Sequence, residues 1–423
     1  MSDSNTYAAP LEAAADLPAR RGANESAQAA QREQPAQPAQ PAHQIRHWPA
    51  VLSVALSAAA FCTTEFMPVG LLRYIADGLA VSDGAAGLTI TAPGLLAAVA
   101  APAVTVLVRR QDRRIVLWAL GVLLVLANVI AALAPGFPVL IAARVLFGIG
   151  LGGFWALGAG LGERLVDRAS APKATALIFA GVSVGMLVGG AAGALIGELL
   201  GWRWAFGITA GLAALSLAAQ LASLPRLAVD RQIAVRDLFG LFATPCGRNV
   251  LITMTLGLLG QFAAYTYITP FLSRHAHFGG ETISALLLGY TLIGLLGNFV
   301  GGALAARHAR ATLAAAIGLI GVPLLLLPWC AHAPLQVVLL LALWGIAYGS
   351  MPVVLQVALS EAAPRSTEGS MALFVANFQI SIALGAWAGG CLVDRVGIGS
   401  TMFTAAGLCA AALAALALRG LRR

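Results

Sequence analysis

The chain alternates between long apolar runs and short polar segments, and this pattern begins after His47. Six runs cover residues 48–75, 85–108, 115–134, 138–162, 175–199 and 204–224, and six more cover residues 249–273, 283–305, 311–330, 335–358, 370–394 and 399–418. A helix that crosses a bilayer needs about 20 mostly apolar residues. Each run therefore predicts one span, and the whole pattern predicts an all-α membrane protein with twelve transmembrane helices.

Polar segments divide the chain into five parts. Residues 225–248 form the longest polar connection, and they separate an N-terminal six-helix bundle (48–224) from a C-terminal one (249–418). Residues 1–47 are rich in Ala, Gln and Pro and offer no apolar face to a core, so we expect a disordered tail. We expect this tail, the linker and the C-terminal residues 419–423 to be cytoplasmic.

Composition and charge support a membrane protein. Charged residues make up 10% of the chain, against roughly 25% in ordinary soluble domains, which excludes a water-soluble enzyme. The net charge of +8 comes from basic residues in short loops, not from a basic face that could bind nucleic acid. With the N-terminus in the cytoplasm, 21 of the 26 Lys and Arg residues lie on the inner side and 4 on the outer side. This asymmetry predicts that both termini are cytoplasmic and that the protein crosses the bacterial inner membrane many times.

The two halves repeat each other. A shift of 196 residues places Gly189 on Gly385 and Glu198 on Asp394. Two similar bundles around one central site are the architecture of a rocking transporter, and two such halves suffice for one path, so we expect a monomer in membrane lipid. Glycines at every fourth position from residue 181 to residue 197 predict close packing of one helix backbone against another.

No cofactor or metal is expected. The five cysteines are scattered without a CxxC pair, and no phosphate-binding loop of the form GxxxxGK[ST] occurs. A proton gradient is therefore the energy source that we expect.

Almost every charged residue lies in a loop or at the end of a predicted span, and the two exceptions are Glu65 and Arg144. Buried charges are costly in a membrane and mark ion or substrate paths. Their positions put Glu65 about 12 Å and Arg144 about 9 Å below the outer edge of the membrane, so the two can approach each other. We interpret Glu65 as the proton carrier and Arg144 as its coupling partner. A fixed structural ion pair or a lock between helices is the alternative.

Neutral polar and aromatic residues lie within the later spans, where Glu65 and Arg144 have no charged counterparts. Amides and rings suit a neutral polar ligand, although bonds between helices would use the same groups. The candidate substrate-binding residues are Trp155, Gln261, Tyr265, Asn298, Gln356, Asn377 and Gln379.

Several stretches resemble the twelve-span drug:proton antiporter group of the major facilitator superfamily. RVLFGIG (144–150) is similar to the fourth-span motif of that group, whose Arg is linked to proton coupling, and this implies that role for Arg144. TTEFMPVGLL (63–72), GGFWALGA (152–159) and GQFAAYTYITPFL (260–272) look most like purine ribonucleoside efflux pumps, with sugar efflux transporters next.

The chain departs from the superfamily at two motifs. In the loop between spans two and three, TVLVRRQDRR (105–114) keeps only Arg110, Arg113 and Arg114 of the motif GxxxDRxGRR. In the fifth span, Gly190 replaces the proline of GPxxGG. The resemblance therefore implies transport more strongly than antiport.

These features together favour proton-coupled export of a small polar solute, with a purine nucleoside or related compound as the first candidate. Sugar or amphiphilic drug efflux and uncoupled diffusion remain alternatives. A membrane sensor or scaffold without flux is an alternative of a different class.

Overall fold

The computed structural model describes residues 47–107, 111–158, 161–167, 169–227, 244–362 and 367–418. Nearly all of the predicted tail, residues 228–243 of the linker and the C-terminal residues 419–423 lie outside this range.

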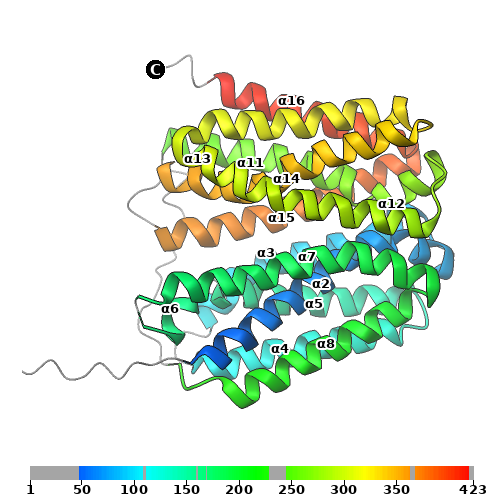
Figure 1. Ribbon diagram of the computed structural model, residues 1–423. Coiled ribbons are helices and arrows are strands. Elements are labelled where there is room, and N and C mark those ends of the chain that lie inside the picture. Colours follow the sequence, from blue (N-terminus) through cyan, green and yellow to red (C-terminus); the bar gives the residue numbers. More distant parts are fainter. Residues whose placement is uncertain are drawn as a thin grey trace, which may run out of the picture. The chain divides into compact units, whose positions relative to one another are not determined.

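The described residues form helices joined by short connections, with no β-strand among them (Figure 1). Helices suit a bilayer because each one satisfies its own backbone hydrogen bonds. The N-terminal half contains α2 (Trp48–Leu79), α3 (Asp83–Leu107), α4 (Arg113–Ala132), α5 (Phe137–Gly158), α6 (Gly162–Leu165), α7 (Ala171–Leu199) and α8 (Trp202–Ser223). The C-terminal half contains α11 (Pro245–Tyr265), α12 (Ile268–Pro270), η1 (Phe271–His275), α13 (Gly280–Cys330), α14 (Pro334–Ala362), α15 (Thr367–Arg395) and α16 (Gly399–Leu418).

Two predicted spans differ in detail from the structure. The seventh span is not one straight helix, because α11 and the segment Ile268–His275 meet at an angle of 44°. Pro270 has no N–H to donate to the carbonyl of Thr266, which explains a break at this point. The predicted boundary between the eighth and ninth spans falls at His308, where α13 has a kink and not an extended loop.

The helix α13 nevertheless makes two crossings. A straight helix of 51 residues would be about 76 Å long, far more than the roughly 30 Å of a bilayer core. Its backbone leaves the helical region at His308, where φ is −145° and ψ is 65°. Counted this way, and with the bent segment as one span, the described chain has the twelve predicted spans.

The spans pack as two bundles. In the first, α2 lies against α7 and α8, while α4 and α5 pack on each other; in the second, α11 lies against α15 and α16, while α13 packs on α14. The bundles meet where α3 contacts α15 and where α7 contacts α13 (Figure 1). An even number of spans places Trp48 and Leu418 at the same end, which we call the terminal end. We call the opposite end, where α2 ends and α3 begins, the distal end.

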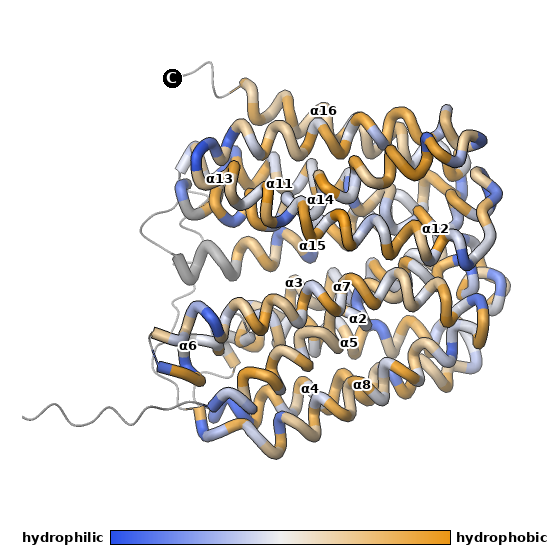
Figure 2. Tube along the Cα trace, in the orientation of Figure 1, coloured by the Kyte–Doolittle hydropathy of each residue, from blue (hydrophilic) through white to orange (hydrophobic). Residues whose placement is uncertain are grey.

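The outer surfaces of the helices are apolar along their length, with hydrophilic residues at the ends (Figure 2). Leu296, Phe299 and Val300 on α13, for example, are all more than half exposed in the isolated chain. Exposed apolar surface on this scale has a favourable environment only in lipid. The chain is therefore a multi-pass membrane protein.

The glycine ladder packs as predicted. A Cβ atom on Gly181, Gly185 or Gly193 would overlap or crowd backbone atoms of α2, and one on Gly189 would lie 3.1 Å from the carbonyl of Thr63. Thr63 also donates a hydrogen bond to the carbonyl of Gly185 at 3.4 Å. Glycine thus lets α2 and α7 approach backbone to backbone.

Replacing Gly181 tests this packing. Its added methyl group would meet the carbonyl of Ala55, so we expect Gly181→Ala to destabilise the protein by about 1–3 kcal/mol. The measurement is thermal unfolding of the purified protein. Gly211→Ala on α8 is the matched control, because a Cβ there meets nothing within 4 Å. An equal melting temperature for the two variants would contradict the account.

Candidate functional site

Glu65 is buried near the middle of α2, with 7% of its surface exposed. It lines a cavity between the two bundles that has room for about one water molecule. The other residues around this cavity are apolar or glycine: Phe66, Val69, Ile90, Pro93, Gly94, Leu151, Phe262 and Ile382. The carboxyl group therefore lies where both bundles can act on it.

Two side chains of the second bundle approach Glu65 with unused hydrogen-bonding capacity. Gln379 on α15 interacts with the carboxyl group, yet neither polar atom of its amide makes a hydrogen bond of good geometry. The buried hydroxyl of Tyr348 on α14 also interacts electrostatically with Glu65 and has no partner. Buried polar groups are normally paired, so these two unpaired groups are candidates for binding a ligand.

Arg144 on α5 is fully buried and joins three helices of the first bundle. Its Nε donates to the carbonyl of Thr89 on α3 at 2.7 Å, and its Nη1 donates to the carbonyl of Thr64 on α2 at 3.1 Å. Pro68 and Pro93 follow these threonines by four residues. Proline has no N–H, so both carbonyls lack their normal helical donor. Arg144 supplies the two missing donors.

The predicted approach of Glu65 and Arg144 is only partly correct. The two side chains interact electrostatically, but no nitrogen of Arg144 comes within 4.0 Å of a Glu65 oxygen. A fixed ion pair is therefore wrong for this conformation, whereas the contacts of Arg144 with α2 and α3 are those of a lock between helices. The guanidinium group lies 4.5 Å from the ring of Phe147, and its Nη2 atom has no partner.

Asn128 on α4 adds to the hydrogen bonds around Thr64, and it was not among the residues predicted from the sequence. Its Nδ2 donates to the hydroxyl of Thr64 at 3.2 Å and to the carbonyl of Leu124 at 2.9 Å. Hydrogen bonds thus link α2, α3, α4 and α5 around Thr64, the residue before Glu65.

The second bundle contains a buried cluster of one amide and several aromatic rings. Gln261 accepts a hydrogen bond from the indole of Trp344 at 2.6 Å and donates to the hydroxyl of Tyr290 at 3.1 Å. Tyr265 stacks on Tyr290, with 5.2 Å between ring centroids. Tyr348 lies beside both of these tyrosines. The structure therefore brings Gln261 and Tyr265 together, as a substrate site requires.

The remaining candidates are spread over the molecule. Asn377 is already hydrogen-bonded within the second bundle, where its Oδ1 accepts from the hydroxyl of Thr255 at 2.9 Å. Asn298 and Gln356 are half-buried. Asn298 lies eight residues from Tyr290 along α13, and Gln356 lies eight residues from Tyr348 along α14, in both cases toward the terminal end. Trp155 packs edge-on against Phe154 in the core of the first bundle.

The loop motif is only partly described, because Arg110 lies outside the described residues. Arg113 and Arg114 begin α4, and the guanidinium of Arg114 lies 4.8 Å from the ring of Trp118. Asp112 accepts from the N–H groups of Arg114 at 2.9 Å and Leu227 at 3.1 Å. Partial loss of water raises the pKa of Asp112. The two hydrogen bonds stabilise the ionised carboxylate and lower this pKa by more, so that it lies below its usual value.

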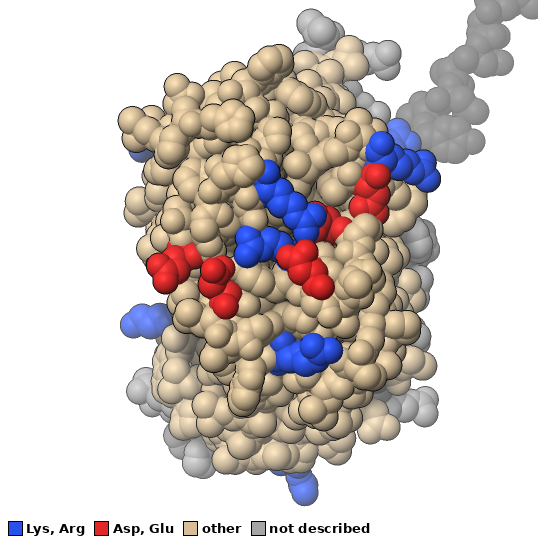
Figure 3. Space-filling model, turned by 90° about the vertical axis from the view of Figure 1, so that its right-hand side faces the viewer, with Lys and Arg blue, Asp and Glu red and all other residues tan. Residues whose placement is uncertain are grey.

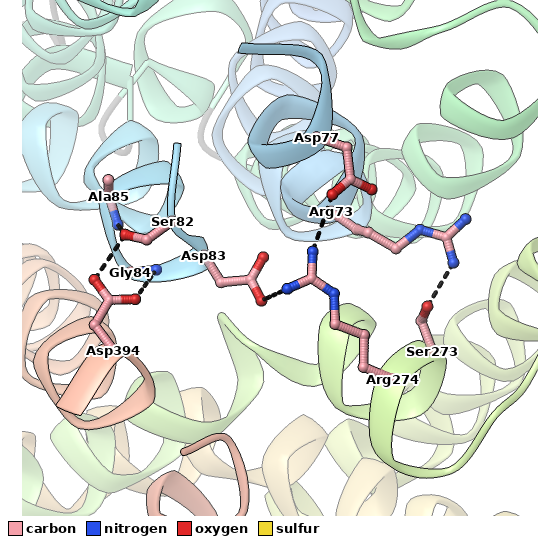
Figure 4. A network of polar contacts seen from close by, with 9 residues as sticks. All are labelled: Arg73, Asp77, Ser82, Asp83, Gly84, Ala85, Ser273, Arg274 and Asp394. Atoms are coloured by element: carbon pink, nitrogen blue, oxygen red, sulfur yellow. Dashed lines mark hydrogen bonds and ion pairs between the residues drawn. The ribbon is translucent and has the colours of Figure 1, made fainter. Parts of the chain in front are cut away.

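Charged residues gather across the middle of the distal end (Figure 3). Arg274 of η1 donates to Asp83 at 2.6 Å and to Asp77 at 3.0 Å, and Arg73 donates to Ser273 (Figure 4). These bonds join the two bundles. These contacts could not be predicted from the sequence, because spacing along the chain does not show which loops meet.

Replacing Arg144 tests its contacts with the two carbonyls. Lysine keeps the charge but does not have the fork that reaches both Thr64 and Thr89, so Arg144→Lys should lose at least about 1.5 kcal/mol of stability. Thermal unfolding measures the change. Arg248→Lys, at an exposed arginine of α11, is the control, and equal stability of the two variants would contradict the assignment.

Comparison with known proteins agrees with this architecture. The purine ribonucleoside efflux pump NepI of Escherichia coli is 30% identical over 356 residues, which are 84% of this chain and 90% of that protein. The transcription regulatory protein OpdE of Pseudomonas aeruginosa is 34% identical over 365 residues, which are 85% of this chain and 91% of that protein.

Solved structures and a family model agree on the fold. A bacterial homolog of the human lysosomal transporter Spinster, in an inward-facing and occupied conformation, matches 87% of this chain and 95% of its own with a TM-score of 0.71 at 16% identity. The model described as Major Facilitator Superfamily matches residues 52–268 and residues 250–423. The predicted resemblance is confirmed: the chain belongs to the Major Facilitator Superfamily, and it is a membrane transporter and not an enzyme.

Proposed function

We propose that the protein exports a small polar organic solute, with a purine nucleoside or related compound favoured, in exchange for protons. The observation that carries this proposal is the position of Glu65, a buried carboxyl group on the cavity between the two bundles. The name of the E. coli relative, a purine ribonucleoside efflux pump, supports the class of solute and the direction of transport.

Glu65 is the proton carrier in this proposal. A carboxyl group in dry surroundings favours its protonated form, and one in contact with water or a cation favours its ionised form. Rocking of the bundles changes the surroundings of the cavity, because its walls come from both of them. Arg144 fixes the backbone next to Glu65 and contributes positive charge nearby.

The aromatic cluster and the unpaired polar groups form the proposed solute site. Tyr265, Tyr348 and Phe262 offer ring faces for a planar base, and the amide of Gln379 and the hydroxyl of Tyr348 offer donors and acceptors for its edge. Gln261 fixes the ring of Trp344 and the hydroxyl of Tyr290.

The proposal also covers the membrane and the orientation. Both termini face the cytoplasm of a bacterium, and the chain works as a monomer in the inner membrane. The distribution of Lys and Arg residues along the sequence supports this orientation. The distal end then faces outward.

Two other functions each have one observation in their favour. The cavity beside Glu65 has apolar walls that include Phe66 and Phe262, which would suit an amphiphilic drug. The relative that is 34% identical is named a transcription regulatory protein, which favours a regulatory role beside transport. Transport assays separate these functions by solute and by flux.

Inverted membrane vesicles test the proposed exchange. We expect an outward-directed proton gradient, with the vesicle interior acidic, to drive uptake of radiolabelled purine ribonucleosides, and Glu65→Gln to reduce this uptake to the level of vesicles without the protein. Glutamine matches the shape of glutamate but cannot take up and release a proton as a carboxyl group does. Binding of the solute to the purified variant should persist.

Glu281→Gln is the control, since this acid is exposed in the first turn of α13. Proton-driven uptake by Glu65→Gln at the level of this control would refute the role of Glu65. Drug or sugar uptake without nucleoside uptake would refute the favoured solute.

A pair of tyrosine variants tests the solute site. Tyr348→Phe removes an unpaired hydroxyl, so it should weaken nucleoside binding about five- to tenfold and leave the melting temperature unchanged or higher. Tyr290→Phe removes a hydroxyl that accepts from Gln261, so it should lower the melting temperature. Titration calorimetry and thermal unfolding measure both effects. Unchanged affinity in Tyr348→Phe would remove this residue from the site.

A further inference from the structure

A carboxylate of the second bundle caps the first turn of a helix in the first bundle. Asp394, near the end of α15, accepts from the hydroxyl of Ser82 at 2.7 Å and from the N–H of Gly84 at 3.1 Å (Figure 4). These two residues lie at the beginning of α3, where free N–H groups and the helix dipole favour negative charge. A Cβ atom on Gly84 would overlap the carboxylate of Asp394 and lie 2.5 Å from the carbonyl of Gly390.

The reciprocal contact occurs on the other side of the interface. Glu198, near the end of α7 in the first bundle, lies at the beginning of α13 in the second. A Cβ atom on Gly280, the first residue of α13, would overlap the carboxylate of Glu198 and lie 2.8 Å from the hydroxyl of Tyr74. Tyr74 donates to Glu198, and Arg73 lies 3.9 Å from it.

The internal repeat relates these two contacts. The shift of 196 residues that places Glu198 on Asp394 also places Gly84 on Gly280. Each half therefore supplies one acid and one glycine, and each acid meets the glycine of the other half. Chance would not pair four residues by the same shift and also bring them together across the interface.

Other bonds between the bundles surround these contacts. Arg274 bridges Asp77 and Asp83, and Thr269 donates to the carbonyl of Val69 at 2.8 Å. Both acid–glycine pairs cross from one bundle to the other, so they can persist only while the distal ends stay together.

We infer that the pairs Asp394–Gly84 and Glu198–Gly280 are a duplicated latch that holds the distal end closed. The latch selects one of the two states of the transport cycle, and this inference does not depend on the solute or on proton coupling. Glycine is required at both positions because any side chain would displace the carboxylate from the beginning of the helix.

Spin labels on the distal ends of the two bundles test the latch. Leu200 and Val396 are suitable label sites because they are exposed, at 57% and 70%, and are related by the same shift. Double electron–electron resonance in lipid nanodiscs, in a variant without the native cysteines, reports their separation. We expect Gly84→Ala to raise the ratio of separated to closed distal ends about tenfold, because the carbonyl of Gly390 cannot move aside.

Gly280→Ala should shift the ratio in the same direction but by less, because the side chains that it meets can rotate. Gly279→Ala and Gly136→Ala are the controls, since a Cβ there meets nothing closer than 3.9 Å. Distances in Gly84→Ala and Gly280→Ala that match those of the controls would overturn the latch.

Isosteric variants of the two acids remove the charge without adding bulk. They test the latch even if a glycine variant does not fold. Glu198→Gln and Asp394→Asn should each favour separated distal ends about two- to fivefold, the range for partly exposed charges. Their combination should exceed either variant alone. Unchanged ratios in all three proteins would also overturn the inference.

Discussion

Arg144 closes a gap in the backbone hydrogen bonding of the first bundle, and the position of Glu65 depends on it. A bilayer offers no water to a free carbonyl, so every backbone group in a span needs a partner inside the protein. Pro68 and Pro93 leave the carbonyls of Thr64 and Thr89 without helical donors, and a single guanidinium group reaches both. The same contacts fix α2, α3 and α5 relative to one another at the level of the buried acid. The contacts of Arg144 are thus those of the lock between helices that the sequence left open as an alternative to a coupling role.

The two bundles share a fold but divide the chemistry. The first supplies the buried charges Glu65 and Arg144, and the second supplies the amide of Gln261 with its surrounding rings. Gln379 and Tyr348 of the second bundle interact with Glu65 across the interface. In the proposed mechanism such a site responds to the relative position of the bundles, because the proposed proton carrier and the proposed ring surfaces for the solute lie in different halves. The proposed coupling follows from this division.

The sequence predicted the parts of the structure that depend on local pattern. Long apolar runs gave twelve spans, and the spacing of glycines in α7 gave its close contact with α2. It did not predict the break before Pro270, and it did not predict that a kink at His308 would replace an extended loop, because short polar segments in a membrane protein are compatible with loops and with helix. The carbonyl partners of Arg144 could have been found from two prolines that follow threonines by four residues. The role of Tyr348 and the contacts of Arg274 could not, because spacing fixes depth along a helix but not which neighbouring side chains meet.

The central claim is that one carboxyl group, Glu65, holds a proton in the absence of the solute and releases it when the solute binds. Counting the protons released when the purified protein binds a purine ribonucleoside in weakly buffered solution, with a pH indicator, tests this claim most directly. The account predicts that the natural protein releases protons as the solute binds and that Glu65→Gln releases none. Equal release from both proteins, or solute binding by the natural protein without any release, would contradict it.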